Sequence, residues 1–393
     1  MKYSKFDGKR ILIWGFGREG QSTKHFLAKF CDPASVEVFE GKREGIDESL
    51  YDYIVKSPGI IMHDDNSKYT SQTQIFLECY RNNTIGITGT KGKSTTSALM
   101  HHVLASAGMK TVLLGNIGEP CLDYFGEIDE DTVVVFEMSC HQLAHVTVSP
   151  HIGVFLNLFE EHLDYYETFD RYFAAKANIA KFMKEDDILY VGGNVPRLAT
   201  DAAISRIDMN EVPQYDLKIL GHHNSYNAHF VYRIATEVFH IDGGAVKAAL
   251  SDFSGLAHRL QHIGCVDGVD YYDDSISTIP SATIEALSSV ENAKTVLIGG
   301  MDRGINYNPL IEYVNSHREY EYIFSYDSGK RIYDSVNKTD NCHYVADLEK
   351  AVKLAAAVTP TGMAVILSPA SASYGYFKNF EQRGEIFRSL CGL

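Results

Sequence analysis

The chain has 393 residues, of which 45% are hydrophobic and 22% are charged, and its formal net charge is −15 at pH 7. This composition is typical of a soluble globular protein of about two to three domains, and the acidic balance argues against nucleic acid or an anionic membrane as a partner. No apolar run reaches the roughly 18 residues of a membrane-spanning helix and no signal-peptide core follows the N-terminus, so we expect a cytoplasmic protein.

The first predicted part is a small α/β unit that ends near residue 84. Its predicted strands cover residues 10–14, 36–39 and 53–55. The pattern Gly15-x-Gly17-x-x-Gly20 opens a helix over residues 21–30, and Glu40 comes about 20 residues later, as in a dinucleotide-binding fold. The glycine pattern alone is a weak signal, so NAD binding is one alternative. A unit of about 80 residues is only half of a dinucleotide fold and suits a single nucleotide diphosphate.

The most informative segment is Gly89-Thr-Lys-Gly-Lys-Ser-Thr95, which lies between a β-branched run at residues 85–88 and a helical pattern. Such a glycine turn directs backbone N–H groups and the helix N-terminus at an anion. Lys93 would reach the β- and γ-phosphates of a nucleotide, and the Ser94 hydroxyl would bind Mg²⁺. The spacing is shorter than in the usual phosphate loop, which leaves an ordinary strand–turn–helix junction as the alternative. We therefore predict binding of ATP or GTP and chemistry at the γ-phosphate.

Alternating strand and helix patterns continue to the C-terminus and predict two further α/β parts. In the central part, strands are predicted at residues 111–114, 132–136 and 152–156, and helices at 226–238 and 244–250. In the last part, the predicted strands cover 268–272, 294–298, 320–324 and 363–367, which is a doubly wound pattern. The expected domains are residues 1–84, 85–255 and 256–393.

Several polar residues follow predicted strands, at the sheet edge where open parallel sheets bind ligands. Glu137 is a candidate Mg²⁺ ligand or, alternatively, an acidic residue that favours a helix N-terminus. His162 and Asp164 could bind a second Mg²⁺ or polarise a phosphate, although an isolated histidine is often only a polar surface residue. Lys176 has small and apolar neighbours, so desolvation would lower its pKa and favour reaction with CO₂; a solvated helix lysine is the alternative.

Two more candidates lie in the last part of the chain. Arg259 could hold a phosphate through two parallel hydrogen bonds. Asp274 ends a predicted strand and could hold a ribose hydroxyl.

The shortened glycine loop and the clusters after it, in this order, resemble the Mur ligases over essentially the whole chain. Two C-terminal segments, Ser368-Pro-Ala-Ser-Ala-Ser373 and Phe377-Lys-Asn-Phe-Glu-Gln-Arg-Gly384, are similar to the glutamate-adding member of that family. The resemblance implies three α/β domains: an N-terminal Rossmann-like half-domain for UDP, a central P-loop ATPase domain with a parallel sheet, and a doubly wound Rossmann-like domain for the amino acid. It also implies ATP and two Mg²⁺ ions.

The same resemblance assigns roles to individual residues. Catalysis would rest on Lys93, His162 and Lys176, with Lys176 carbamylated by CO₂ so that it offers an anionic oxygen to Mg²⁺. ATP would be bound by Gly89, Thr90, Lys91, Gly92, Lys93, Ser94, Thr95, Asn224, Asn227, Arg259 and Asp274. Metal ligands would be Ser94, Glu137, His162 and Lys176. The UDP substrate would be held by Gly17, Arg18, Glu19, Glu40 and Asn116, the last at its muramoyl part. Glutamate would be held by Thr278, Arg303, Ser373 and Phe380, with Arg303 facing its carboxylates.

The implied reaction joins glutamate to UDP-N-acetylmuramoyl-L-alanine. ATP would convert the alanine carboxylate to an acyl phosphate, and the glutamate amine would then displace phosphate. A monomer is expected. Where the family usually has Asp-Ser-Lys-Ala-Thr, this chain has Asp274-Ser-Ile-Ser-Thr278, so Ile276 replaces a lysine near the amino-acid pocket. D-glutamate is the family default, and this departure leaves L-glutamate as an alternative.

Three other functions compete with this interpretation. Folylpolyglutamate synthases share the chemistry but usually lack an N-terminal glycine-rich half-domain such as residues 15–20. An NAD-dependent oxidoreductase would explain those glycines but leaves Lys93 and Ser94 without a role. A silent nucleotide-binding partner would tolerate loss of the candidate catalytic residues, yet Lys93, Glu137, His162 and Lys176 are all present.

Overall fold

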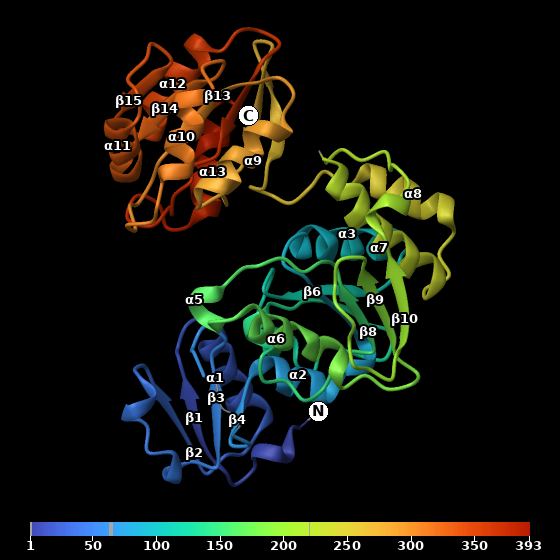
Figure 1. Cartoon of the computed structure of the whole chain (residues 1–393). Coiled ribbons are helices and arrows are strands. Elements are labelled where there is room, and N and C mark those ends of the chain that lie inside the picture. Colours follow the sequence, from blue (N-terminus) through green and yellow to red (C-terminus); the bar gives the residue numbers. More distant parts are fainter. Residues whose placement is uncertain (1, 63–65, 220) are drawn as a thin grey trace. The chain divides into compact units, whose positions relative to one another are not determined.

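The computed structural model describes residues 2–62, 66–219 and 221–393, and it contains three mainly parallel β-sheets with helices packed against them (Figure 1). The chain forms two compact units: residues 1–217 with 222–253, and residues 218–221 with 254–393. The predicted α/β class is confirmed. The predicted domain limits after residues 84 and 255 stay a prediction.

The N-terminal sheet has the strand order β2-β1-β3-β4, and all of its pairings are parallel. Its strands are β1 (Arg10–Trp14), β2 (Ser35–Phe39), β3 (Tyr53–Lys56) and β4 (Tyr69–Thr70). The helices of this region are α1 (Arg18–Phe30) and α2 (Gln72–Tyr80). Helix α1 begins earlier than predicted because Gly17 takes the N-cap position directly after the turn.

The central sheet has six parallel strands in the order β10-β9-β8-β5-β7-β6. They are β5 (Thr84–Thr88), β6 (Thr111–Gly115), β7 (Val133–Glu137), β8 (Ile152–Phe155), β9 (Ile188–Gly192) and β10 (Ala203–Ile207). The helices are α3 (Lys93–Ser106), α4 (Cys140–Leu143), α5 (Leu163–Tyr166), α6 (Phe169–Lys181), α7 (His222–Glu237) and α8 (Gly243–Asp252). Because β5 lies between β7 and β8, the segments after these three strands meet at one edge of the sheet.

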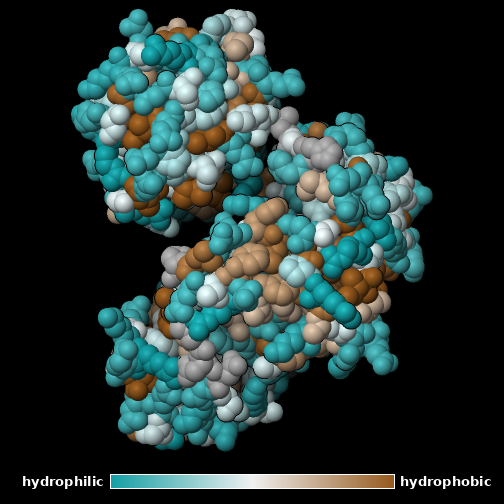
Figure 2. Space-filling view, in the orientation of Figure 1, coloured by the Kyte–Doolittle hydropathy of each residue, from teal (hydrophilic) through white to brown (hydrophobic). Residues whose placement is uncertain are grey.

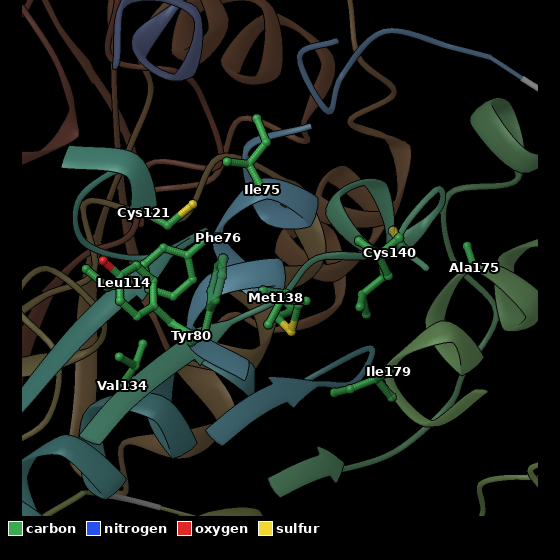
Figure 3. Packing of buried hydrophobic residues seen from close by; sticks show 14 of the residues in the cluster. Ile75, Phe76, Tyr80, Leu114, Cys121, Val134, Met138, Cys140, Ala175 and Ile179 are labelled. Atoms are coloured by element: carbon green, nitrogen blue, oxygen red, sulfur yellow. The ribbon is translucent and has the colours of Figure 1, made fainter. Parts of the chain in front are cut away.

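One continuous hydrophobic core joins the N-terminal region to the central sheet. Helix α2 carries Phe76 and Tyr80 into this core, where they lie beside Leu114 and Val134 of the central sheet (Figure 3). The rings of Phe76 and Phe136 meet edge to face, with their centroids 5.6 Å apart. Complete burial of such a side chain contributes roughly 1.5–3 kcal/mol, so this packing holds the two sheets in one compact unit.

The C-terminal sheet has the order β11-β12-β16-β13-β14-β15. Its strands are β11 (Gln261–Val266), β12 (Val269–Asp273), β13 (Ala293–Ile298), β14 (Glu321–Ser325), β15 (Cys342–Val345) and β16 (Ala364–Leu367). Its helices are α9 (Pro280–Ser289), α10 (Asn308–Ser316), α11 (Tyr326–Ser335), α12 (Leu348–Val358) and α13 (Phe380–Leu390). Two separate cores, one with α9 to α11 and one with α12 and α13, lie against the sheet, so the predicted doubly wound arrangement is confirmed. The edge strand β11 is antiparallel to β12, which the sequence pattern did not reveal.

Hydrophilic residues cover most of the face shown in Figure 2, and hydrophobic residues form smaller patches on it. Within the described part of the chain, no helix has both the length and the apolar character needed to cross a membrane. Short 3-10 helices cover Ser4–Phe6, Arg43–Gly45, Glu48–Leu50, Arg81–Asn83, Cys121–Tyr124 and Met209–Glu211.

Candidate active site

The glycine loop connects β5 to α3 at the carboxyl edge of the central sheet. Gly92 has a φ angle of 84°, a left-handed conformation that strains residues other than glycine. A Cβ atom at Gly92 would also lie 2.5 Å from Oδ1 of Asn227, so α7 packs directly against the loop. The Asn227 side-chain amide donates to Oδ1 of Asn224 at 3.1 Å. The structure therefore brings this predicted pair of asparagines to the phosphate loop.

Asn157, to which sequence analysis gave no role, fixes the conformation of this loop. Its Oδ1 accepts a bond of 2.9 Å from the Lys91 N–H, and its Nδ2 donates to the Lys91 carbonyl at 3.0 Å. Its carbonyl accepts a bond of 3.0 Å from the Thr90 N–H. A signal was present, because Asn157 comes just after β8, the strand beside β5.

Two lysine side chains converge on one backbone oxygen of the loop. Lys93 Nζ donates to the Gly89 carbonyl at 3.0 Å, and Lys176 Nζ donates to the same oxygen at 2.8 Å. Lys176 is 1% exposed, and burial together with the nearby charge of Lys93 lowers its pKa to about 7. Burial also lowers the pKa of Lys93, although the Glu137 carboxylate opposes that shift. The desolvation predicted for Lys176 is therefore present, and an anion such as a phosphate would stabilise two amines so placed.

Glu137 ends β7 and is fully buried, yet one of its oxygens lacks a donor within the described part of the chain. Asn116 Nδ2 donates to Oε1 at 2.7 Å, whereas nothing among the described residues bonds to Oε2. A buried carboxylate oxygen without a partner costs free energy unless a cation approaches it. Glu137 therefore fits its predicted role as an Mg²⁺ ligand. Asn116, predicted to contact the muramoyl group, lies against this carboxylate.

Tyr172 lies between His162 and the glycine loop and contacts both. The His162 ring centroid lies 6.0 Å from that of Tyr172, whose hydroxyl is 3.1 Å from Thr90 Oγ. The His162 side chain is 44% exposed, and its Nε2 lies 3.8 Å from a carboxylate oxygen of Glu161. An exposed imidazole in this position can bind a metal or a phosphate oxygen. The side chain of Asp164 lies outside the described residues.

The predicted UDP residues lie around the turn between β1 and α1. Gly17 is the N-cap of α1, and Glu40 is an exposed residue directly after β2. The Arg18 guanidinium donates to the Gly118 carbonyl at 3.3 Å and to the Glu119 carboxylate at 3.4 Å. The glycine turn therefore lies beside the segment that follows β6.

Glu19, one of the predicted UDP residues, contacts helix α4 of the central region. Its carboxylate accepts a bond of 3.2 Å from Gln142 Nε2 on α4. Burial raises the pKa of Glu19, although the Gln142 bond and the charge of Lys56 oppose that shift. Gln142 also forms a capping box with Ser139, and Ser139 lies only two positions after Glu137 in the chain. Glu19 thus connects the predicted UDP site to the segment that carries the predicted metal ligand.

In the unit of residues 254–393, Asp274 is a buried carboxylate with several donors. The Leu260 N–H donates to its Oδ1 at 3.0 Å, and the hydroxyls of Ser277 and Ser368 donate to its Oδ2. Burial outweighs these bonds and raises the pKa of Asp274 to about 6. Because Leu260 follows the exposed Arg259, Asp274 holds the loop that carries the predicted phosphate ligand. Its contact with ribose stays a prediction.

Arg383 is a buried residue to which sequence analysis gave no role. Its guanidinium donates to Ser275 Oγ at 2.9 Å, to the Ser275 carbonyl at 2.7 Å and to the Ser371 carbonyl at 3.1 Å. These bonds join the loop after β12, which carries Thr278, to the loop after β16, which carries Ser373. A signal was present, because Arg383 belongs to the C-terminal motif quoted above.

The predicted glutamate ligands differ in exposure. Ser373 is buried, Thr278 and Phe380 are half-buried, and Arg303 is exposed. Ile276, which replaces the family lysine, is half-buried and donates its N–H to the His258 carbonyl at 3.1 Å. The contact of these predicted ligands with glutamate stays a prediction, whereas Arg383 bonds to the loops themselves.

Comparisons with known proteins agree with this arrangement. Residues 87–204 match the family model described as the Mur ligase middle domain. The chain is 32% identical to the UDP-N-acetylmuramoyl-L-alanine–L-glutamate ligase of Salinispora tropica, and the match covers 98% of each chain. It is also 32% identical to the UDP-N-acetylmuramoylalanine–D-glutamate ligase of Streptococcus agalactiae, over 97% of this chain and 96% of that protein.

A solved structure shows the same fold. The crystal structure of the MurF ligase from Thermotoga maritima in complex with ADP superimposes with a TM-score of 0.60. The match covers 90% of this chain and 93% of that chain at 19% sequence identity. At this identity the likeness concerns the fold.

Proposed function

Because this chain belongs to the Mur ligase family of ATP-dependent C–N ligases, we propose that it adds glutamate to UDP-N-acetylmuramoyl-L-alanine in the synthesis of peptidoglycan precursors. The observation that carries the proposal is the similarity, over nearly the whole chain, to two ligases named for this reaction. The paired lysines at the Gly89 carbonyl support it, because a transferring phosphoryl group carries negative charge that two neighbouring amines can stabilise.

The proposed reaction has two steps. An oxygen of the alanine carboxylate attacks the γ-phosphorus of ATP, and the bond between that phosphorus and the leaving ADP oxygen breaks. The glutamate nitrogen then attacks the acyl carbon, phosphate leaves, and the nitrogen loses a proton as the amide forms. Lys93 and the backbone N–H groups at the start of α3 would donate to the phosphoryl oxygens during the first step, while Asn157 holds the loop in its conformation.

The residues at the loop fit Mg²⁺. Glu137 offers a buried oxygen without a donor among the described residues, Ser94 offers a hydroxyl at the start of α3, and His162 offers an exposed imidazole. These side chains would hold the ion, which when bound would neutralise charge on the phosphate oxygens. A second ion is part of the same proposal.

We further propose that Lys176 carries a carbamate. CO₂ reacts with a neutral amine: the lysine nitrogen bonds to the carbon, and one proton leaves the nitrogen. A pKa of about 7 leaves a substantial neutral fraction near neutral pH, which supports this reaction. The product is an anionic oxygen donor, and such a group would also relieve the repulsion between Lys176 and Lys93.

The test is release of phosphate from ATP in the presence of UDP-N-acetylmuramoyl-L-alanine and either D- or L-glutamate. Release with D-glutamate alone is the expected result. Release with neither enantiomer would overturn the proposed function. ATP with the UDP substrate but without glutamate serves as the control, since an acyl phosphate that water cannot reach should turn over slowly.

A second candidate is the same reaction with L-glutamate. Two observations favour it: the Salinispora tropica relative is named for L-glutamate, and Ile276 stands where the family usually has lysine. Release with L-glutamate alone would select this candidate and point to the half-buried Ile276 as a determinant of stereochemistry. A cytoplasmic location and a monomeric state stay predictions.

A further inference from the structure

A tyrosine on the short helix α5 connects the predicted UDP site to the predicted metal histidine. The Tyr165 hydroxyl donates to the Ile60 carbonyl at 2.9 Å and lies 3.5 Å from the Pro58 carbonyl. Both carbonyls belong to residues 57–60, which follow β3 in the N-terminal sheet. Burial raises the pKa of Tyr165 to about 12, so its hydroxyl stays protonated and donates at every physiological pH.

The loop of residues 57–60 is itself held tightly. Lys56 is 4% exposed, and its Nζ donates to the same Ile60 carbonyl at 2.7 Å and to the Ser57 carbonyl at 3.2 Å. Ser57 Oγ in turn donates to the Gly15 carbonyl at 3.2 Å. A Cβ atom at Gly15 would lie 2.7 Å from Ser57 Oγ, so the loop packs directly against the glycine turn of the predicted UDP site.

The ring of Tyr165 contacts the other side of this connection. Its centroid lies 4.4 Å from that of His141, and the His141 centroid lies 5.1 Å from that of His162. His162 is the N-cap of α5, and its carbonyl accepts the Tyr165 and Tyr166 N–H groups at 3.1 and 2.9 Å. A shift of Tyr165 therefore moves the backbone that carries His162.

Helix α5 cannot hold this position by itself. It is four residues long, and left-handed backbone conformations bound it, with φ angles of 56° at His162 and 63° at Glu167. A single helical turn is unstable in isolation, so its place is set by tertiary contacts. The Tyr165 hydroxyl bond is such a contact, and it reaches outside the central sheet.

We propose that Tyr165 is a positioning residue: its bond to the Ile60 carbonyl sets the place of His162 and couples that place to occupation of the UDP site. This inference deepens the proposed function and rests on it for the identity of the UDP ligand. The proposal for Tyr165 itself rests only on contacts within the unit of residues 1–217 and 222–253.

The test compares the wild type with Tyr165→Phe, which keeps the ring and removes only the hydroxyl. Histidine ring signals are followed by NMR in metal-free protein, and the His162 signal is identified by its loss in His162→Gln. We expect Tyr165→Phe to move the His162 signal without any ligand. Added UDP should move that signal in the wild type and move it less in the variant. In the ligase reaction, the half-saturating Mg²⁺ concentration should rise about five-fold, as for loss of one hydrogen bond.

The matched control is Tyr322→Phe, because the Tyr322 hydroxyl also donates to a backbone carbonyl, that of His317, at 2.9 Å. An unchanged His162 signal in Tyr165→Phe, or an equal change in Tyr322→Phe, would overturn the proposal. If Tyr165→Phe does not fold, Lys56→Met removes the bond from Lys56 to the Ile60 carbonyl and should also move the His162 signal of the ligand-free protein. Calorimetry with UDP separates the two proposals: absent UDP binding counts against the proposed function, while the ligand-free His162 signal still decides the role of Tyr165.

Discussion

The central site and the C-terminal site differ in how far hydrogen bonds satisfy their buried charged groups. At the glycine loop, Lys93 and Lys176 share one carbonyl, and a Glu137 oxygen lacks a donor among the described residues. In the C-terminal unit, Asp274 and Arg383 are surrounded by hydroxyls and carbonyls that bond to them. Buried charges without full partners indicate a site that a charged ligand completes. Buried charged groups whose hydrogen bonds are all made to neutral protein groups indicate a structural role, in which they hold the loops that carry the predicted ligand-binding residues.

This contrast predicts different consequences for substitutions in the two regions. Changes at the central site should reduce turnover or ligand affinity far more than stability. Changes to the buried C-terminal pair should reduce stability first and affect glutamate binding through the loops.

The largest effect on catalysis is expected for Lys176→Ala. Loss of the group that would bear the carbamate should reduce turnover by at least about 10²-fold, the size of effect seen when one transition-state contact is removed. Added acetate should restore part of the activity, because it can supply an oxygen ligand. Steady-state phosphate release measures both effects.

Lys181→Ala is the matched control for this variant, since Lys181 is an exposed residue of the same helix. The carbamate itself is checked by NMR with ¹³CO₂. Incorporation should be slow below pH 7 and should rise as pH increases through the lowered pKa of about 7, because the neutral amine is the reactive form. Full activity in Lys176→Ala would contradict both the carbamate and the catalytic role given to the buried lysines of the central site.

The second effect is expected for Gly92→Ala. The added Cβ would lie 2.5 Å from Asn227 Oδ1, so the loop and α7 would have to move apart. We expect ATP affinity to fall about ten-fold, equivalent to about 1.4 kcal/mol, as measured by calorimetry. Gly108→Ala separates strain from contact, because Gly108 has a similar φ of 80° but nothing within 4 Å of the added atom. Equal loss of ATP affinity in both variants would attribute the effect to backbone strain alone.

Sequence analysis found the elements of the central site because its signals are local. The β-branched run before Gly89 and the helical pattern after Ser94 predicted a strand, turn and helix, and the structure has β5 and α3 there. The two-residue strand β4 is too short for any periodicity, and the antiparallel pairing of β11 depends on its neighbour and not on its own pattern.

Asn157 and Arg383 were missed for a different reason. Asn157 bonds to Lys91, 66 positions away, and Arg383 bonds to Ser275, 108 positions away. No spacing rule in the sequence connects residues so far apart, because their contact arises only when the parallel sheet has formed. Their residue types and motifs were visible, whereas their partners were not.

Substitution of Arg383 should reduce stability, because this residue holds two loops of the C-terminal unit in place. Arg383→Met keeps an apolar stem but leaves the Ser275 and Ser371 carbonyls without their donor. We expect the free energy of unfolding to fall by about 3–4 kcal/mol, because two buried carbonyls lose a donor, together with a higher KM for glutamate. Denaturant unfolding and steady-state kinetics measure the two. Arg388→Met, at an exposed position of the same helix, should change neither.

Asp274 should give the stability of the C-terminal unit a pH dependence. Its pKa is raised from 3.8 to about 6, so the folded state binds a proton that the unfolded state has already released between these values. The resulting stabilisation is complete below pH 4 and is lost as pH rises through about 6, which amounts to roughly 3 kcal/mol at most. Asp274→Asn lacks this titration, so the difference in unfolding free energy between wild type and variant should change between pH 4 and pH 6.5 and be constant above that range. A constant difference throughout would mean that the hydroxyl bonds of Ser277 and Ser368 fully offset burial. In that case Asp274 would be ionised in the folded state at pH 5 and available to a ligand, as the ribose prediction requires, and the C-terminal site would resemble the central one.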